Sequence, residues 1–128
     1  MLEGRHSPAK RKFVFAREKS EELGDINWII VWSCRIAQAE IATQNLSGAE
    51  PHLRQAVDLS QQFILPVPTE ALLTRVNTQF WNAAGQRNEA RKWLTQAYRI
   101  GQERNMLHQL RLLMPLVHEL EYAVDFAP

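Results

Sequence analysis

Apolar residues recur at helical spacing in six stretches of this chain. Residues three and four positions apart lie on one face of a helix, and no stretch alternates apolar and polar residues as a strand does. The predicted helices cover approximately residues 8–23, 27–44, 48–62, 70–84, 89–101 and 106–122. The pattern therefore predicts an all-α protein of about six helices, with residues 1–128 forming a single domain.

Residues that cap helices stand before most of these stretches. Their side-chain oxygens accept hydrogen bonds from the unpaired N–H groups of the first helical turn. The expected caps are Ser7, Asp25, Ser47, Thr69 and Asn88. Pro51 is expected in the tolerant first turn of the third helix. Pro115 is expected to bend or break the last helix.

A short signature, alanine–large residue–alanine at i, i+4 and i+7, recurs along the chain. Its copies begin at Ala9, Ala49 and Ala90, which are 40 and 41 residues apart. Gly4 and Gly85 each lie five residues before the first alanine, where a positive φ would end the preceding helix. This period predicts a helical-repeat architecture. The alternative is a small helical bundle without repeat geometry.

The segment 85–97 resembles the tetratricopeptide repeat (TPR). Gly85–Ala90 resembles its turn and the start of its second helix, and Trp81 stands at the aromatic position. Leu94 takes the large packing position, whereas the middle copy has Gln44 in place of the turn glycine. Because the period exceeds the usual 34 residues, the chain is most similar to long repeats, such as those in the sensor arms of bacterial transcription activators related to the maltose regulator.

The resemblance implies antiparallel helix hairpins stacked as a short right-handed α-solenoid. The first and last copies are incomplete. We interpret them either as caps of a short stack or as a sign that the chain is a fragment of a longer array. In such stacks, the first helix of each hairpin lines a concave surface that holds a protein or peptide.

The register of the resemblance predicts this concave surface residue by residue. Its expected positions are Cys34, Gln38, Ile41, Arg75, Gln79, Asn82, Leu116 and Leu120, with Val31, Leu72 and Leu113 beside them. Arg75 is suited to a carboxylate partner, and the two amide side chains could bond an extended peptide backbone. The alternative for the leucines of the last helix is that a neighbouring helix covers them.

Composition limits the environment and the partners. The formal net charge is +1, so no global attraction to nucleic acid or membranes follows. Cys34 is the single cysteine and cannot form an internal disulfide, which is typical of a reducing compartment. No apolar run is long enough to cross a bilayer, and the polar start lacks the apolar core of a secretion signal. We therefore expect a cytoplasmic protein.

Signals of catalysis and cofactor binding are missing from the sequence. The histidines His6, His52, His108 and His118 show no metal-ligand spacing, and no phosphate-binding loop or nucleophile elbow occurs. We expect no enzyme activity, no cofactor and no metal. Lys10, Arg11, Lys12, Arg17 and Lys19 form a basic cluster that we interpret as a solvated helix face rather than a nucleic-acid contact.

Three hypotheses for function follow. The first is a TPR-like scaffold that binds a protein or peptide as part of a regulatory or signalling protein. The second is a structural unit that forms a homodimer through its first and last helices. The third is the sensing or oligomerising arm of a transcription regulator, which would need a DNA-binding domain elsewhere in its polypeptide.

Overall fold

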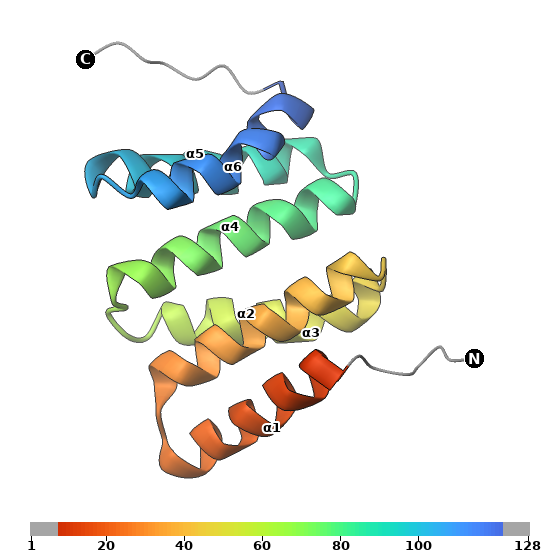
Figure 1. Ribbon diagram of the computed structural model, residues 1–128, viewed down its shortest axis with the longest axis vertical. Coiled ribbons are helices and arrows are strands. Elements are labelled where there is room, and N and C mark those ends of the chain that lie inside the picture. The colour runs from red at the N-terminus through yellow and green to blue at the C-terminus, as the bar shows by residue number, and fades with distance from the viewer. Residues whose placement is uncertain (1–7, 122–128) are drawn as a thin grey trace. The chain divides into compact units, whose positions relative to one another are not determined.

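The computed structural model describes residues 8–121, and within them the chain is all-helical, as predicted (Figure 1). The six helices are α1 (Pro8–Leu23), α2 (Ile26–Ala42), α3 (Leu46–Ser60), α4 (Val67–Ala83), α5 (Arg87–Glu103) and α6 (Leu107–Glu119). Their contacts divide the chain into two compact units, with the boundary inside α4 between Leu73 and Thr74. We describe each unit by itself.

Four of the connections between helices share one backbone conformation. Each contains a residue of positive φ, followed by a residue with φ near −90° and ψ between 74° and 90° that precedes the next helix. The positive-φ residues are Gly24 (69°), Gln44 (62°), Gly85 (74°) and Asn105 (54°). The equivalence of Gln44 and Gly85, 41 residues apart, agrees with the repeat period of the sequence.

Hydrogen bonds define these connections as Schellman turns. The N–H of Gly85 donates to the carbonyl of Asn82 (3.1 Å), and the N–H of Gln86 donates to the carbonyl of Trp81 (2.9 Å). The other three connections contain the same pair of bonds. Gly85 therefore has the role that the sequence predicted, while Gly4 lies outside the described residues.

The alanine signature is buried in two of its three copies. Its buried members are Ala49, Leu53 and Ala56 in α3, and Ala90, Leu94 and Ala97 in α5. In α1, by contrast, Ala9 is exposed, and Phe13 and Ala16 are only half-buried. The three copies are therefore not equivalent, because the corresponding face of α1 is not covered in the same way.

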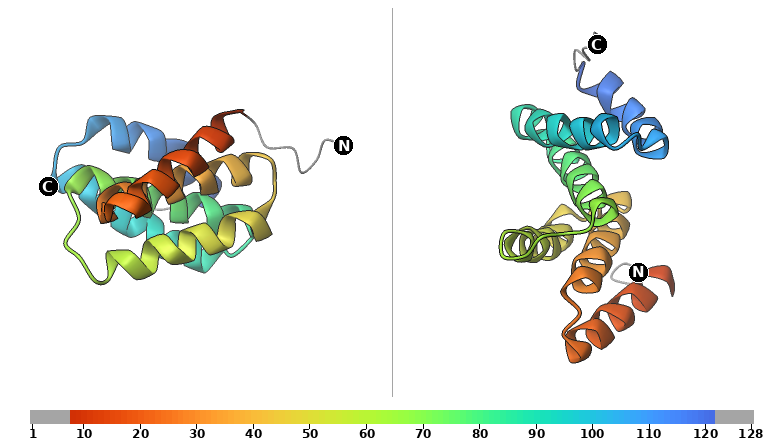
Figure 2. Two further views of the ribbon diagram at one scale, coloured as in Figure 1. Left: turned by 90° about the horizontal axis from the view of Figure 1, so that it is seen from below. Right: turned by 90° about the vertical axis from the view of Figure 1, so that its left-hand side faces the viewer.

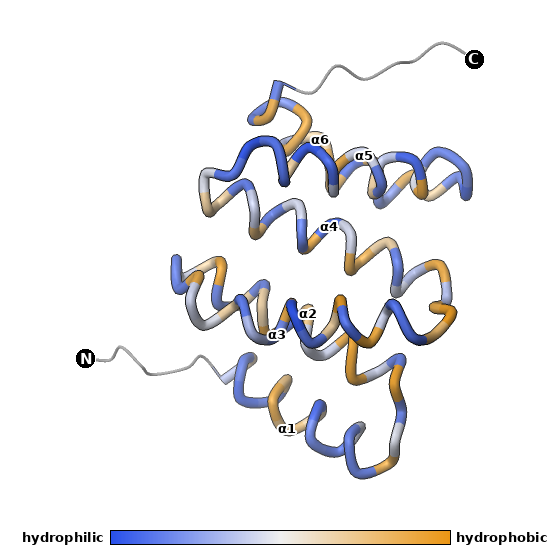
Figure 3. Tube along the Cα trace, turned by 180° about the vertical axis from the view of Figure 1, so that it is seen from behind, coloured by the Kyte–Doolittle hydropathy of each residue, from blue (hydrophilic) through white to orange (hydrophobic). Residues whose placement is uncertain are grey.

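In the first unit, α2 packs against both α1 and α3 (Figures 1 and 2). Its side chains Ile30, Ile36 and Ala37 are fully buried. Phe13 of α1 stacks on Trp32 of α2, with ring centroids 5.7 Å apart. Most of α1 is nevertheless hydrophilic, as Figure 3 shows.

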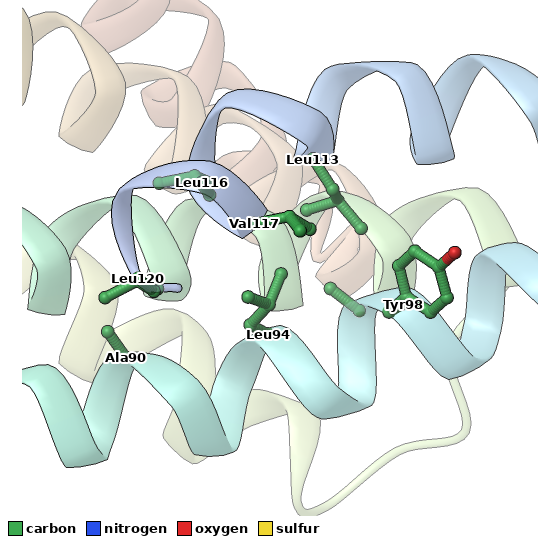
Figure 4. Packing of buried hydrophobic residues seen from close by; sticks show 8 residues of the cluster. Ala90, Leu94, Tyr98, Leu113, Leu116, Val117 and Leu120 are labelled. Atoms are coloured by element: carbon green, nitrogen blue, oxygen red, sulfur yellow. The ribbon is translucent and has the colours of Figure 1, made fainter. Parts of the chain in front are cut away.

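In the second unit, α5 packs against α6 (Figure 4). The core between them is formed by Ala90, Leu94, Ala97, Tyr98, Leu113, Leu116, Val117 and Leu120. Gly101 permits a close approach of the two helices, since a Cβ there would lie 2.7 Å from Cδ2 of Leu110. The first turn of α5 lies beside the last turn of α6, where Arg91 donates to the carbonyl of Leu120.

Several predicted caps are wrong by a few residues. Asn45, not Ser47, caps α3 and accepts from the N–H of Gly48 (3.2 Å). The reason is that the positive φ of Gln44 fixes the turn, so that the very next residue takes the cap position. Pro51 is consequently the sixth residue of α3 rather than part of its first turn.

The other predicted caps and the predicted break in the last helix had mixed outcomes. Gln86 takes the cap position of α5 without a side-chain hydrogen bond, so Asn88 is not a cap. Thr69 lies inside α4 and donates to Oδ1 of Asn27 instead of capping. The helix α6 continues through Pro115 without a break. Asp25 is confirmed as a cap, whereas Ser7 lies outside the described residues.

Candidate functional site

Three polar side chains lie along one face of α4. Arg75, Gln79 and Asn82 are spaced at i, i+4 and i+7, which places them on the same side of a helix, and all three are half-buried. A half-buried polar row of this kind is held by the fold yet still reachable by solvent. All three residues are positions of the predicted concave surface.

Two hydrogen bonds connect this row to α6. Nη1 of Arg75 donates to Oε1 of Gln109 (2.6 Å), and Nδ2 of Asn82 donates to Oε1 of Glu119 (3.0 Å). The two bonds join α4 to α6 at two separate points, 34 and 37 residues apart in the sequence. We call these five residues the polar strip: Arg75, Gln79, Asn82, Gln109 and Glu119.

Buried side chains of α4 alternate with the polar row along the helix. Val76, Thr78 and Phe80 are buried, and the hydroxyl of Thr78 donates to the carbonyl of Thr74 (2.8 Å) inside the helix. Phe80 also meets Trp81 edge to face, with ring centroids 5.1 Å apart. Close packing of these buried neighbours restricts the motion of α4 beside the polar row.

Two arginine side chains of α5 hold the C-terminal end of α6, the second helix that carries residues of the polar strip. Arg91 donates to the carbonyl of Leu120 through Nε (3.0 Å) and Nη2 (2.6 Å), and Arg87 donates to the same carbonyl (3.1 Å). Carbonyls at a helix C-terminus lack partners within the helix. These bonds anchor the end of α6 immediately beside Glu119.

The polar strip presents both donors and acceptors of hydrogen bonds. The guanidinium group of Arg75 is only a donor, the amides of Gln79 and Asn82 are both donor and acceptor, and an ionised carboxylate of Glu119 is only an acceptor. An extended peptide backbone offers one donor and one acceptor per residue. The strip therefore offers both kinds of hydrogen-bonding group that a peptide backbone uses.

The structure places the other predicted site residues differently. Cys34 is fully buried in α2, whereas Gln38 and Ile41 are half-buried on the same helix of the first unit. Gln38 accepts from Nη1 of Arg35 (2.9 Å). Leu116 and Leu120 are 7% and 2% exposed and belong to the core against α5. Their placement agrees with the alternative that a neighbouring helix covers these leucines.

Gln109 and Glu119 were missed by the sequence reasoning. The leucines of the last helix dominate its pattern, and the polar positions between them carry no prediction. A signal was available, because Gln109 is a polar residue four positions before Leu113 on the same helix face. It is buried, with 2% of its surface exposed, although amide side chains are mostly exposed in proteins.

A second group of polar side chains joins α1, α2 and α3. Nζ of Lys10 lies 2.5 Å from Oε2 of Glu40, and the two side chains are only 8% and 9% exposed. Nδ2 of Asn45 donates to the other oxygen of Glu40 (3.3 Å), and Nη1 of Arg17 lies 2.5 Å from Nδ1 of His52. We call these residues the α1 cluster. Lys10 is buried and therefore does not belong to the solvated face that its sequence context predicted.

The pKa of His52, a member of the α1 cluster, is shifted by its surroundings. Burial lowers its pKa below the ordinary value of 6.5, and the positive charges of Arg17 and Lys10 lower it further, while Glu40 acts in the opposite direction. A neutral imidazole can accept a hydrogen bond at Nδ1 from the guanidinium group of Arg17. The contact between these two side chains therefore requires neutral His52.

Neither metal-ligating clusters nor spanning helices occur in the part of the chain that the structure describes. Across residues 8–121, no three side chains of histidine, cysteine, aspartate or glutamate lie together so that they could hold a metal ion. In the same range, every helix is too short or too polar to traverse a bilayer.

Comparison with known proteins gave no relative. No protein-family model matches the chain, and no curated protein or solved structure matches it significantly. The likeness to the tetratricopeptide repeat therefore depends on the chain's own residues and turns.

Proposed function

We propose that this chain is a TPR-like scaffold that binds a protein or peptide segment along the polar strip. Helix hairpins that follow one another in the same orientation would explain why Gln44 and Gly85 end helices with the same unusual φ. They would also explain the burial of the alanine signature in both α3 and α5. In this proposal, the stack is a short right-handed α-solenoid.

The observation that carries the proposal is the pair of bonds between α4 and α6. They hold Arg75 and Asn82 in fixed geometry before any partner arrives. Side chains that are already ordered lose little conformational entropy on binding, so more of the interaction energy is realised as affinity. We infer a role within a regulatory or signalling protein, where such binding would recruit or sense a partner.

Removal of Arg75 and Gln79 should weaken peptide binding. Peptides are selected from a displayed random library on the immobilised full chain, and the best is titrated by calorimetry. The double variant Arg75→Ala/Gln79→Ala should raise Kd by about tenfold or more, which corresponds to about 1.4 kcal/mol. The variant would lose one hydrogen bond from the charged Arg75 and one from the neutral amide of Gln79, and the loss of two such bonds accounts for a decrease in binding free energy of this size.

The matched control is Arg99→Ala, which removes an exposed arginine of α5 that is outside the strip. It should leave Kd unchanged. Equal affinity of the Arg75→Ala/Gln79→Ala variant and the unaltered chain would show that the strip is not the binding surface.

Self-association is the second candidate, and exposed apolar side chains favour it. Phe15 and Leu23 of α1 are 60% and 82% exposed, and Leu107 of α6 is 60% exposed. If the first and last helices pair between chains, light scattering of the full chain should give twice the mass of 14.8 kDa. A monomer at concentrations well above the micromolar range would exclude this candidate.

A further inference from the structure

The helix α1 has polar side chains at both of its buried positions. Its buried residues are Lys10 and Ser20, and its apolar side chains Phe15 and Leu23 are largely exposed. The ring stack of Phe13 on Trp32 is the aromatic contribution to this attachment. A helix that buries little apolar surface is among the least stable elements of a fold. Such a helix can detach or unfold locally while the rest of the fold stays intact.

Two contacts of the α1 cluster hold α1 to different helices. Lys10 pairs with Glu40 of α2, and Arg17 contacts His52 of α3. The second contact depends on protonation. A proton on Nδ1 of His52 would place an N–H donor against the N–H of a guanidinium group, and it would add a positive charge beside Arg17 and Lys10.

We propose that the α1 cluster is a pH-sensitive latch, which holds α1 against α2 and α3 when His52 is neutral and releases α1 on acidification. The charged groups that face His52 are Arg17 and Lys10 on α1 and Glu40 on α2. Two of these are cations carried by the helix that is released. Detachment of α1 therefore removes both from the imidazole at once.

The direction of the pH dependence follows from linkage. In the closed state burial and the two cations of α1 lower the pKa of His52; in the open state both cations are removed, so the pKa rises toward its ordinary value. The open state thus binds more protons. Above pH 6.5, the ordinary pKa of histidine, neutral His52 contributes its full stabilisation to the closed state. The closed state loses this stabilisation as the pH falls through the lowered pKa of His52.

Hydrogen exchange of the full chain tests the latch. Amide exchange is measured at about pH 7.5 and about pH 5.5, and opening equilibria are derived after correction for the intrinsic rate. The opening equilibrium of amides in 8–23 should rise several-fold at the lower pH, while those of α5 and α6 stay constant. Equal increases in all helices, or no increase in α1, would overturn the proposal.

Two variants separate the latch from a general effect of acid. His52→Asn keeps an oxygen acceptor near the position of Nδ1 but does not titrate, so α1 should open to the same extent at both pH values. His118→Asn removes an exposed histidine of α6 and should preserve the response of the unaltered chain. A response that persists in His52→Asn contradicts the latch.

A measurement on the unaltered chain makes the test independent of whether His52→Asn folds. The ring signals of His52 are followed by NMR as the pH is changed. A titration midpoint below 6.5 supports the proposal. A midpoint at or above this value overturns it, because acid would then stabilise the closed state.

Discussion

Replacement of Leu94 by alanine should lower the free energy of unfolding by about 3 kcal/mol, within the range of about 2–5 kcal/mol for buried leucines. Leu94 is fully buried at the centre of the contact between α5 and α6 (Figure 4). Its removal leaves a cavity beside Leu113 and Val117, and Ala90 and Ala97 on either side are too small to fill it. Urea denaturation followed by circular dichroism measures the loss.

Leu107→Ala is the control for this prediction. Leu107 begins α6 and is 60% exposed, so the same chemical change should cost less than about 1 kcal/mol. A loss for Leu94→Ala no greater than for Leu107→Ala would mean that α5 and α6 do not pack through the buried signature.

Replacement of Glu40 by leucine should destabilise the first unit by about 3–5 kcal/mol, because it strands a charge in the interior. Lys10 is 7% exposed, and its ammonium group pairs with Glu40 in the described structure. The double variant Lys10→Met/Glu40→Leu removes both charges and should recover most of the loss, since apolar groups of similar volume can replace a buried ion pair. Urea denaturation of the single and double variants gives the two values.

An exposed pair supplies the control for Glu40. Glu50 and Arg54 form an i, i+4 bridge on α3, with side chains 52% and 65% exposed. Glu50→Ala should cost at most about 0.5 kcal/mol, because solvent screens such pairs. If Glu40→Leu behaved like Glu50→Ala, the α1 cluster would be solvated rather than buried.

The helices were predictable because their signals are local. Apolar spacing gives α1 to α6 within a few residues, and Gly24 and Gly85 mark turns that need a positive φ. The caps of α3 and α5 were missed because the turn geometry, rather than the identity of a polar residue, selects the cap. No local rule assigns a positive φ to Gln44, since β-carbon sterics disfavour it.

The polar groups were less predictable because they depend on contacts far apart in sequence. Glu40 and Lys10 are 30 residues apart, and Arg75 and Gln109 are 34 residues apart. Helical spacing correctly placed Arg75, Gln79 and Asn82 on one face of α4. It could not distinguish leucines of α6 that face α5 from leucines that face solvent, because both patterns recur at the same period.

Chemical-shift mapping by NMR tests the central claim most directly. The full chain is titrated with the peptide selected for binding, and backbone and side-chain amide signals are followed. We expect the largest changes at the side-chain amides of Gln79 and Asn82 and at the backbone of α4 and α6 around the polar strip. Changes confined to α1, α2 or α3, with the strip undisturbed, would contradict the account.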